Sequence, residues 1–278
     1  MQKQLTFLLW TPPYTDEWGG VIVLHRLAEI LASKGYPTYT TGPTKQGSLA
    51  KFVGDVPNLS INPETTMVIY PEIVSGNPFN SKHITRWVLY TPGKNGGDGK
   101  YPSSDLVYKY WDIFEVSDDI RVDGYLRCID TKKDFFVDQG LERSGTCHLL
   151  KKGLQYAKNF NQHPSDSQSL DGFINDEHLK NVFNQKEMFI SYDAMSYHSI
   201  QAALCGCLSV VIPDPGVSKS EWQERADIYK YGIAYGLDDI QWAKDTMHLV
   251  RDRMKDLEDE CDELVDKYIE HCKKVIQI

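Results

Sequence analysis

The sequence predicts an α/β protein with two Rossmann-like domains and a long C-terminal helix. Short apolar runs alternate with amphipathic segments in both halves of the chain, and the tail keeps a seven-residue apolar repeat. Such alternation is typical of parallel sheets covered by helices. We therefore expect a Rossmann-like domain at 1–143, a second at 144–240, and a helix at 241–278 that packs on the protein.

The first half opens with a strand, a loop, a helix and a second strand. Residues 5–10 form a continuous apolar run, which is typical of a strand buried on both faces. After a polar loop and Gly19-Gly20, apolar residues recur at helical spacing from Val21 to Leu31, and Gly35 is a natural stop. Further strands are expected at 36–41, 67–70, 87–90, 113–116 and 125–129.

The second half repeats this alternation. Strands are expected at 147–150, 188–190 and 208–212, with helices at 177–183 and 197–204 between them. In the tail, apolar residues alternate steps of four and three, at Ala243, Met247, Val250, Met254, Leu257, Cys261, Leu264 and Tyr268. This seam predicts a helix that packs on its own protein, and a homodimer through the same helix is the alternative.

Composition narrows the function classes. The net charge of −9 and the pI of about 5.4 argue against nucleic acid as the main partner, because phosphate backbones favour an excess of lysine and arginine. The six cysteines include no CxxC pair, so we expect reduced, packed thiols and no zinc site. No apolar stretch approaches the roughly 20 residues that span a bilayer. We expect a cytoplasmic protein without a transmembrane segment, in the host cytoplasm if it is viral.

Parallel sheets bind ligands beyond the carboxyl ends of their strands, and the loop at 11–20 has that position. Gly19 and Gly20 would let a ligand approach the backbone, and the following helix offers N–H donors to phosphate. The alternative is a tight turn that only needs glycine. The chain has no GxxxxGK[ST] and no GxGxxG after the strand, which argues against P-loop NTPases and standard NAD-binding proteins.

The first half also carries candidates for a general base. Asp16 and Glu17 lie in the loop, Glu72 follows an expected strand, and His25 lies on the first helix. A transfer to a hydroxyl needs such a group to take the proton, and Asp16 is our first choice. The alternatives are exposed loop charges, a turn-capping Glu72 and a hydrogen-bonded histidine on a helix face.

Three features in the second half suit a diphosphate. Lys151 and Lys152 follow a strand and could neutralise it, or could lie on a solvated turn. Ser196 is expected at a helix N-cap, which would turn the N–H groups of Tyr197 and the next residues toward the loop; a plain cap is the alternative. Asp193 and Gln201, eight residues apart, could face one nucleotide.

The stretch Ile200-Gln-Ala-Ala-Leu-Cys-Gly-Cys-Leu-Ser-Val-Val resembles the nucleotide-sugar segment of GT-B glycosyltransferases. The common form there is an acidic residue, seven others, then LEAMACGxPVV. On that match Asp193 and Gln201 take the places of the two glutamates of the family's motif, and both glutamates are replaced. The resemblance implies that Gln201 contacts the donor ribose and that Ser196 and Tyr197 contact the diphosphate.

Other stretches are similar to the same family. Gly19-Gly20 with the following helix looks like the GG…LAxxLxxxGH opening, and Lys151-Lys152-Gly153 is similar to the strand end that begins the donor domain. Tyr70-Pro-Glu-Ile-Val-Ser-Gly-Asn-Pro resembles short bacterial surface-polysaccharide and chlorovirus capsid-glycan transferases.

This resemblance implies two domains facing a central cleft and an acceptor-side first domain. It also implies transfer of a sugar from a nucleotide-sugar substrate to a glycan hydroxyl, with no metal or other cofactor. The chlorovirus enzymes include a xylosyltransferase, which implies UDP-xylose as donor and inversion at the sugar. Two alternatives stay open: a non-catalytic nucleotide-sugar or glycan-binding protein, and a sugar-nucleotide epimerase.

Overall fold

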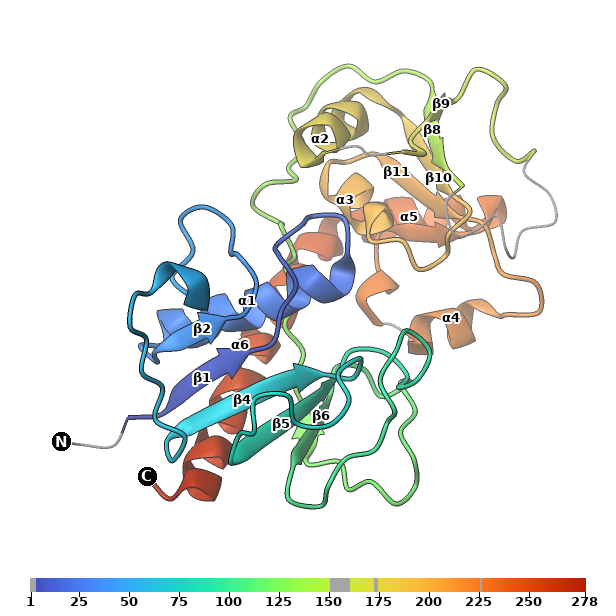
Figure 1. Ribbon diagram of the computed structural model, residues 1–278. Coiled ribbons are helices and arrows are strands. Elements are labelled where there is room, and N and C mark those ends of the chain that lie inside the picture. Colours follow the sequence, from blue (N-terminus) through green and yellow to red (C-terminus); the bar gives the residue numbers. More distant parts are fainter. Residues whose placement is uncertain (1–3, 151–160, 173–174, 226) are drawn as a thin grey trace. The chain divides into compact units, whose positions relative to one another are not determined.

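The computed structural model describes residues 4–150, 161–172, 175–225 and 227–278. It shows an α/β protein with one parallel sheet of seven strands, another of five strands, and a long C-terminal helix (Figure 1). The chain divides into two compact units, Met1–Asp130 with Glu258–Ile278, and Thr131–Leu257. This division falls at 130, whereas the sequence suggested a boundary near 143, and the end of the tail belongs with the first unit.

The sheet of the first unit has the strand order β3-β2-β1-β4-β5-β6-β7. The order reverses between β1 and β4, as in doubly wound dinucleotide-binding sheets, and both strands are short and fully apolar at their centres. Every pair in it is parallel. The strands are β1 (Thr6–Leu9), β2 (Thr38–Thr40), β3 (Lys51–Phe52), β4 (Thr66–Pro71), β5 (His83–Val88), β6 (Leu106–Lys109) and β7 (Gly124–Tyr125).

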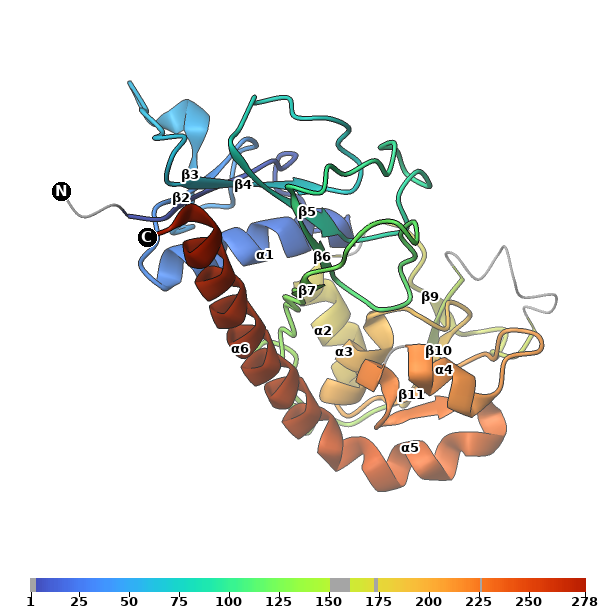
Figure 2. The same ribbon diagram turned by 90° about the horizontal axis from the view of Figure 1, so that it is seen from below.

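Two helices cover one face of this sheet (Figure 2). They are α1 (Gly19–Ser33) and the part of α6 (Val250–Ile276) that belongs to the first unit. Their apolar sides share one core with the strands, built around Phe7, Leu27, Trp87 and Tyr268, none of which is exposed to solvent. The opposite face buries Leu8, Val68, Tyr70, Val74 and Ile84, and partly buried loop residues such as Ile61 and Ile73 cover it.

The sheet of the second unit has the order β12-β11-β10-β8-β9 and reverses between β8 and β10, as in flavodoxin-like sheets. Phe183 of α2 packs on Phe189, while Ala243 of α5 packs on Val210, so these helices lie on opposite faces. The strands are β8 (Thr146–Leu149), β9 (Gln168–Ser169), β10 (Met188–Ser191), β11 (Leu208–Val211) and β12 (Ile233–Tyr235); the helices are α2 (Asp176–Gln185), α3 (His198–Leu204), α4 (Lys219–Arg225) and α5 (Ile240–Thr246).

Some expectations from the sequence are wrong in detail. Residues 113–116 form no strand, and at 125–129 only Gly124–Tyr125 pairs, with β6. The tail is not one helix: a 3-10 turn, Met247–Leu249, separates α5 from α6. The apolar pattern is continuous through this turn, so it carried no signal for the break.

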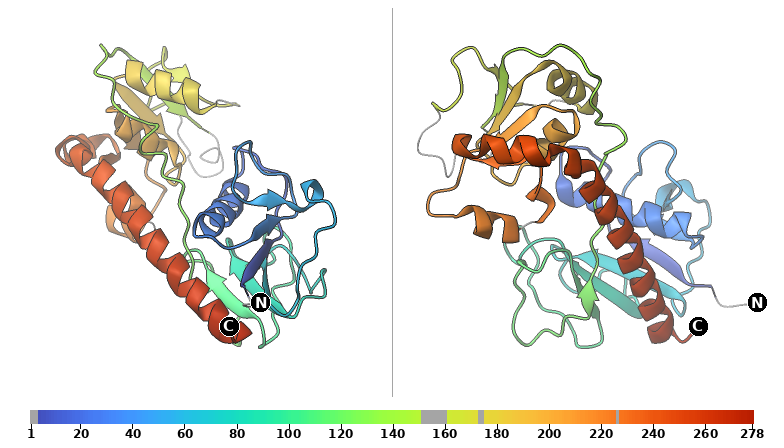
Figure 3. Two further views of the ribbon diagram at one scale, coloured as in Figure 1. Left: turned by 90° about the vertical axis from the view of Figure 1, so that its left-hand side faces the viewer. Right: turned by 180° about the vertical axis from the view of Figure 1, so that it is seen from behind.

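Figure 3 shows the course of α6, and most of the apolar seam of the tail is buried, with Met247 and Leu264 half-buried. Cys261, Val265, Tyr268 and Cys272 of α6 all belong to the core of the first unit. The residues left exposed on this helix are mostly charged, among them Asp262, Asp266 and Lys267. Most of the seam therefore packs within the chain, as the sequence predicted, and a homodimer through this helix stays a prediction.

Candidate functional site

The carboxyl ends of β1 and β4 in the first unit, and of β8 and β10 in the second, mark the two points where strand order reverses. Ligands of open parallel sheets bind at such points. The segments after these four strands contain nearly all the residues selected from the sequence. Lys151 and Lys152 follow β8 but lie outside the described residues.

In the first unit, the loop after β1 is held close to the segment after β2. The Thr41 hydroxyl accepts a hydrogen bond from the Thr11 N–H at 2.9 Å, and the Gly42 N–H donates to the Thr11 hydroxyl at 3.1 Å. A Cβ atom on Gly42 would lie 2.3 Å from the Pro12 carbonyl carbon. Gly42 is therefore required by close backbone packing, which the sequence pattern did not indicate.

Gly19 and Gly20 form the first turn of α1 and are exposed. A Cβ at either would meet nothing within 4 Å, so packing does not require glycine here. The N-cap residue, Trp18, makes no side-chain capping bond, and the first turn carries no acidic residue. The positive end of the helix dipole thus has neither a capping side chain nor an acidic residue in the first turn at the strand-order reversal, and this arrangement suits an anionic ligand.

His25 lies one and a half turns into α1 and is 7% exposed. Its Nε2 donates to the Pro12 carbonyl at 2.9 Å; because a carbonyl only accepts, Nδ1 keeps its lone pair in the neutral ring. Burial lowers the pKa of His25, and Lys45 adds to this, against the opposing effect of the Pro12 bond. A neutral imidazole with one open nitrogen can accept a proton.

A small pocket adjoins this imidazole. It has a volume of about 20 Å³, room for about one water molecule, and is lined by His25, Tyr14, Arg26, Lys45 and Asp130 among others. The Arg26 Nε is buried without a hydrogen-bond partner in the described part of the chain. Charged side chains of both signs line the pocket.

The acidic candidates for the general base differ in burial and in hydrogen bonding. Asp16 is exposed and accepts a 2.6 Å hydrogen bond from the Tyr14 hydroxyl, and Glu17 is exposed in the same loop. Glu72 is only 5% exposed, and its Oε2 accepts from the Leu89 N–H at 3.0 Å. Burial raises the pKa of Glu72, and backbone hydrogen bonds oppose this. Glu72 thus holds the chain where β5 ends, a turn-capping arrangement.

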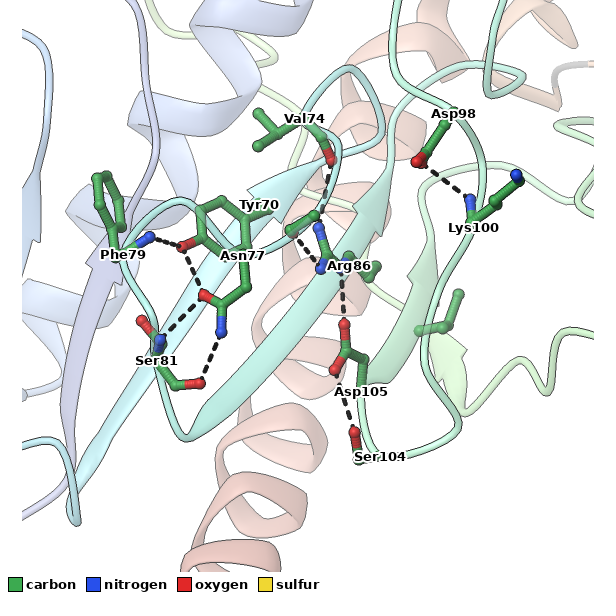
Figure 4. Close-up of polar contacts among 12 residues, drawn as sticks. Tyr70, Val74, Asn77, Phe79, Ser81, Arg86, Asp98, Lys100, Ser104 and Asp105 are labelled. Atoms are coloured by element: carbon green, nitrogen blue, oxygen red, sulfur yellow. Dashed lines mark hydrogen bonds and ion pairs between the residues drawn. The ribbon is translucent and has the colours of Figure 1, made fainter.

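A buried arginine fixes the loops beyond β4 and β5 (Figure 4). Arg86 is 1% exposed, and its Nε donates to Asp105 at 2.8 Å. Its other nitrogens donate to the carbonyls of Val74 and Gly76 in the loop after β4. Asp105 closes the loop before β6, so one guanidinium holds both loops.

Two tyrosines flank this guanidinium, with the rings of Tyr70 and Tyr101 centred 5.1 and 5.5 Å from it. The Tyr70 hydroxyl contacts Asn77 and accepts from the Phe79 N–H (Figure 4). The Tyr101 hydroxyl is buried and has no hydrogen-bond partner among the described residues. It is therefore an open hydrogen-bonding group beside the loops that Arg86 fixes.

In the second unit, Asp193 follows β10 directly. Its Oδ1 accepts from the Met195 N–H at 3.1 Å, and its carbonyl accepts from the Ser196 N–H, also at 3.1 Å. Side chains beyond the sheet lock this turn: Trp222 donates to the Ala194 carbonyl and Tyr229 to the Met195 carbonyl. The turn at the second reversal is thus rigid, and Asp193 is half-buried in it.

The start of α3 differs from the expected cap. The helix begins at His198, and its N-cap is Tyr197 without a side-chain bond. The Ser199 N–H already donates to the Ser196 carbonyl, so it is not open to a ligand as expected. The Tyr197 hydroxyl donates to the Thr131 carbonyl, which directs this ring into its own unit.

Gln201 is 4% exposed, and its Oε1 lies 2.6 Å from Nδ1 of His198. The structure thus links Asp193 to Ser196 through a backbone hydrogen bond, and it links Gln201 to His198 through their side chains. Asp193 and Gln201 remain on the segment and helix that begin at one carboxyl edge.

A second polar group at this edge was not found from the sequence. The Tyr192 hydroxyl accepts from the Gln162 N–H at 2.9 Å and bonds Nδ1 of His163 at 2.8 Å. The His163 ring stacks on His148 at 3.7 Å, and Nδ1 of His148 lies 3.0 Å from the Ser167 hydroxyl. Burial lowers the pKa of His148, and the neighbouring His163 adds to this.

Asp214 is the other missed residue of this edge. It follows β11, and burial raises its pKa; the nearby Arg225 opposes this rise, and Asp193 adds to it. The rule that selected Asp193, an acidic residue directly beyond a strand, would have selected Asp214 as well. His163 lies 14 residues beyond the end of β8, so no spacing pattern pointed to it.

A scan against models of known protein families finds no match for this chain. A search of curated proteins finds no match either. In the described parts of the chain no helix is long and apolar enough to cross a membrane. The same parts contain no cluster of three or more metal-ligating side chains.

Proposed function

We propose that this protein is a GT-B glycosyltransferase that moves a sugar from a nucleotide-sugar to a hydroxyl of a glycan. One observation carries the proposal: the segment from Asp193 onward, which resembles the family's nucleotide-sugar segment, begins at the point where the second sheet reverses its order. That point is where open parallel sheets bind nucleotides. The two parallel sheets support the same assignment.

In this proposal the second unit binds the donor. The half-buried Asp193 carboxylate accepts hydrogen bonds from the donor sugar, and the rigid turn through Ser196 lies beside the diphosphate. Gln201 contacts the ribose, which requires its bond to His198 to open or to be shared. UDP-xylose is the donor that the resemblance favours, with inversion at the sugar.

In the first unit we propose His25 as the base that takes the acceptor proton. It is buried, its pKa is lowered, its Nε2 is engaged by the Pro12 carbonyl while no bond is seen at Nδ1 among the described residues, and its ring lines a small pocket with charged side chains. Asp16 is exposed and already accepts a hydrogen bond from the Tyr14 hydroxyl, and Glu72 accepts one from the Leu89 N–H. These contrasts favour His25 over the first choice from the sequence.

Calorimetric titration with UDP-, GDP- and dTDP-sugars tests donor binding. Asp193→Asn keeps the acceptor for the Met195 N–H but removes the charge, and should weaken the preferred donor by about 1.5–3 kcal/mol. Asp245→Asn, on α5, is the matched control and should bind like the wild type. If no nucleotide-sugar binds to the wild type, the proposal is refuted.

Measurement of turnover distinguishes a glycosyltransferase from a non-catalytic nucleotide-sugar-binding protein. His25→Gln should keep donor binding and lower kcat about 10²–10⁴-fold, the usual share of a general base. Replacement of both family glutamates favours one other function, a nucleotide-sugar-binding protein without activity. Donor binding with no product for any glycan acceptor would support that alternative.

A further inference from the structure

A second pocket lies in the second unit, away from the strand-order reversal. Its volume is about 440 Å³, within the range of small-molecule sites. Leu204 ends α3, and β11 begins at Leu208, so the pocket adjoins the amino ends of the strands. Asp193 and Ser196 follow the carboxyl end of β10, so they belong to the opposite edge of this sheet.

The floor of this pocket is apolar. Ala203, Leu204 and Val250 are buried, and Met247 of the 3-10 turn is half-buried. Gly206 has φ of +77°, and a Cβ there would lie 2.4 Å from the Asp138 carboxylate, so only glycine keeps this part of the lining open. The break between α5 and α6 thus contributes to the pocket rather than to the helix seam.

The rim is positively charged in a protein whose net charge is −9. The exposed Lys244 carries this charge and forms no hydrogen bond or ion pair with the described residues, and His248 beside it is an exposed hydrogen-bonding group. The lining carboxylate, Asp138, is already paired with Arg143 at 2.8 Å. The unbalanced charge at this pocket is therefore positive.

Arg251 is the fixed cation of the rim. Its guanidinium donates to the carbonyls of Lys133 and Phe136, at 2.6 and 3.2 Å. These bonds hold the group in place without neutralising it, and the carboxylate of Asp134 lies 3.8 Å away on a side chain that is 83% exposed. A guanidinium ordered in this way is prepared to bind an oxyanion.

We propose that this pocket binds a small amphipathic anion: a phosphate, sulfate or carboxylate whose apolar body lies on the floor beside Leu204 and Val250. The charged head lies between Arg251 and Lys244. This site is distinct from the proposed donor site and does not depend on it.

Hexyl phosphate is the probe, titrated into the full-length protein with methyl NMR detection. Saturable binding should shift the methyl signals of Leu204, Met247 and Val250, and inorganic phosphate and hexanol should each bind at least tenfold more weakly. Hexyltrimethylammonium, which has the same body and the opposite charge, should not bind. Binding elsewhere, no saturable binding, or equal binding of the cationic probe would overturn the proposal.

Variants identify the head-group contact. Lys244→Gln should weaken hexyl phosphate about two- to fivefold, as expected for one exposed charge, whereas Lys267→Gln on α6 should not change it. Arg251→Gln should weaken the binding of hexyl phosphate more than Lys244→Gln does. Circular dichroism shows whether this variant is folded. Unchanged affinity in Lys244→Gln and in folded Arg251→Gln would contradict the assigned contact.

Discussion

Removing the Arg86 guanidinium should destabilise the first unit strongly. Arg86→Met leaves the Asp105 carboxylate, 5% exposed, without its ion partner, and leaves two loop carbonyls without donors. Breaking a buried pair by removing one partner costs about 3–5 kcal/mol. We expect a loss of that size in the free energy of unfolding of this unit.

The double variant separates the buried charge from the lost hydrogen bonds. Arg86→Met with Asp105→Leu removes both charges, so only the two carbonyl bonds remain lost, at about 1 kcal/mol each. The double variant should therefore be more stable than Arg86→Met alone by about 1–3 kcal/mol. If the loss of unfolding free energy in the double variant equals the sum of the losses in Arg86→Met and Asp105→Leu, the reasoning is refuted.

Native-state hydrogen exchange is the appropriate assay, because a chain of two compact units need not unfold in one step. Amides of β4 and β5 report on the first unit, and amides of β10 and β11 provide an internal reference. Exchange should accelerate in the first pair of strands only. Equal acceleration in both pairs would show that the ion pair does not act locally.

Three further predictions follow from local geometry. Gly42→Ala should destabilise the protein by about 2–4 kcal/mol in thermal melting, because its Cβ would meet Pro12 at 2.3 Å, whereas Gly20→Ala should be tolerated. Because burial lowers the pKa values of His25 and His148, the unfolded state binds more protons than the folded state below about pH 6.5. The free energy of unfolding should therefore fall as the pH drops from 6.5 toward the folded pKa values, and urea titrations at several pH values that show no such fall would contradict the lowered pKa values. Tyr192→Phe should speed hydrogen exchange around residues 161–170, since the loop loses the hydroxyl that accepts from Gln162, and unchanged exchange would contradict this role.

The buried strands could be predicted because their sequences are mostly apolar. Residues 5–10, 67–70, 188–190 and 208–212 each overlap a strand of the structure, namely β1, β4, β10 and β11. The carboxyl-end rule then placed Glu72 and Asp193 directly beyond strands at the reversals. Strand order itself needed the structure, because parallel strands of similar composition can pair in many orders.

Contacts between distant segments could not be predicted. The expected strand at 87–90 omitted Arg86, because a charged residue interrupts the apolar run and its partner lies 19 residues later. Tyr192 and His163 are 29 residues apart and meet only because β8 and β10 are neighbours. Similarly, β12 has only three residues, Ile233–Tyr235, which is too short for an apolar pattern to predict a strand.

Hydrogen–deuterium exchange of the full chain with UDP-xylose, and with GDP- and dTDP-sugars in parallel, tests the central claim most directly. At least one nucleotide-sugar should slow exchange in peptides that cover 191–201 and 212–217, the segments beyond β10 and β11. Protection confined to other peptides, or none with any of these nucleotides, would contradict a donor site at the second reversal.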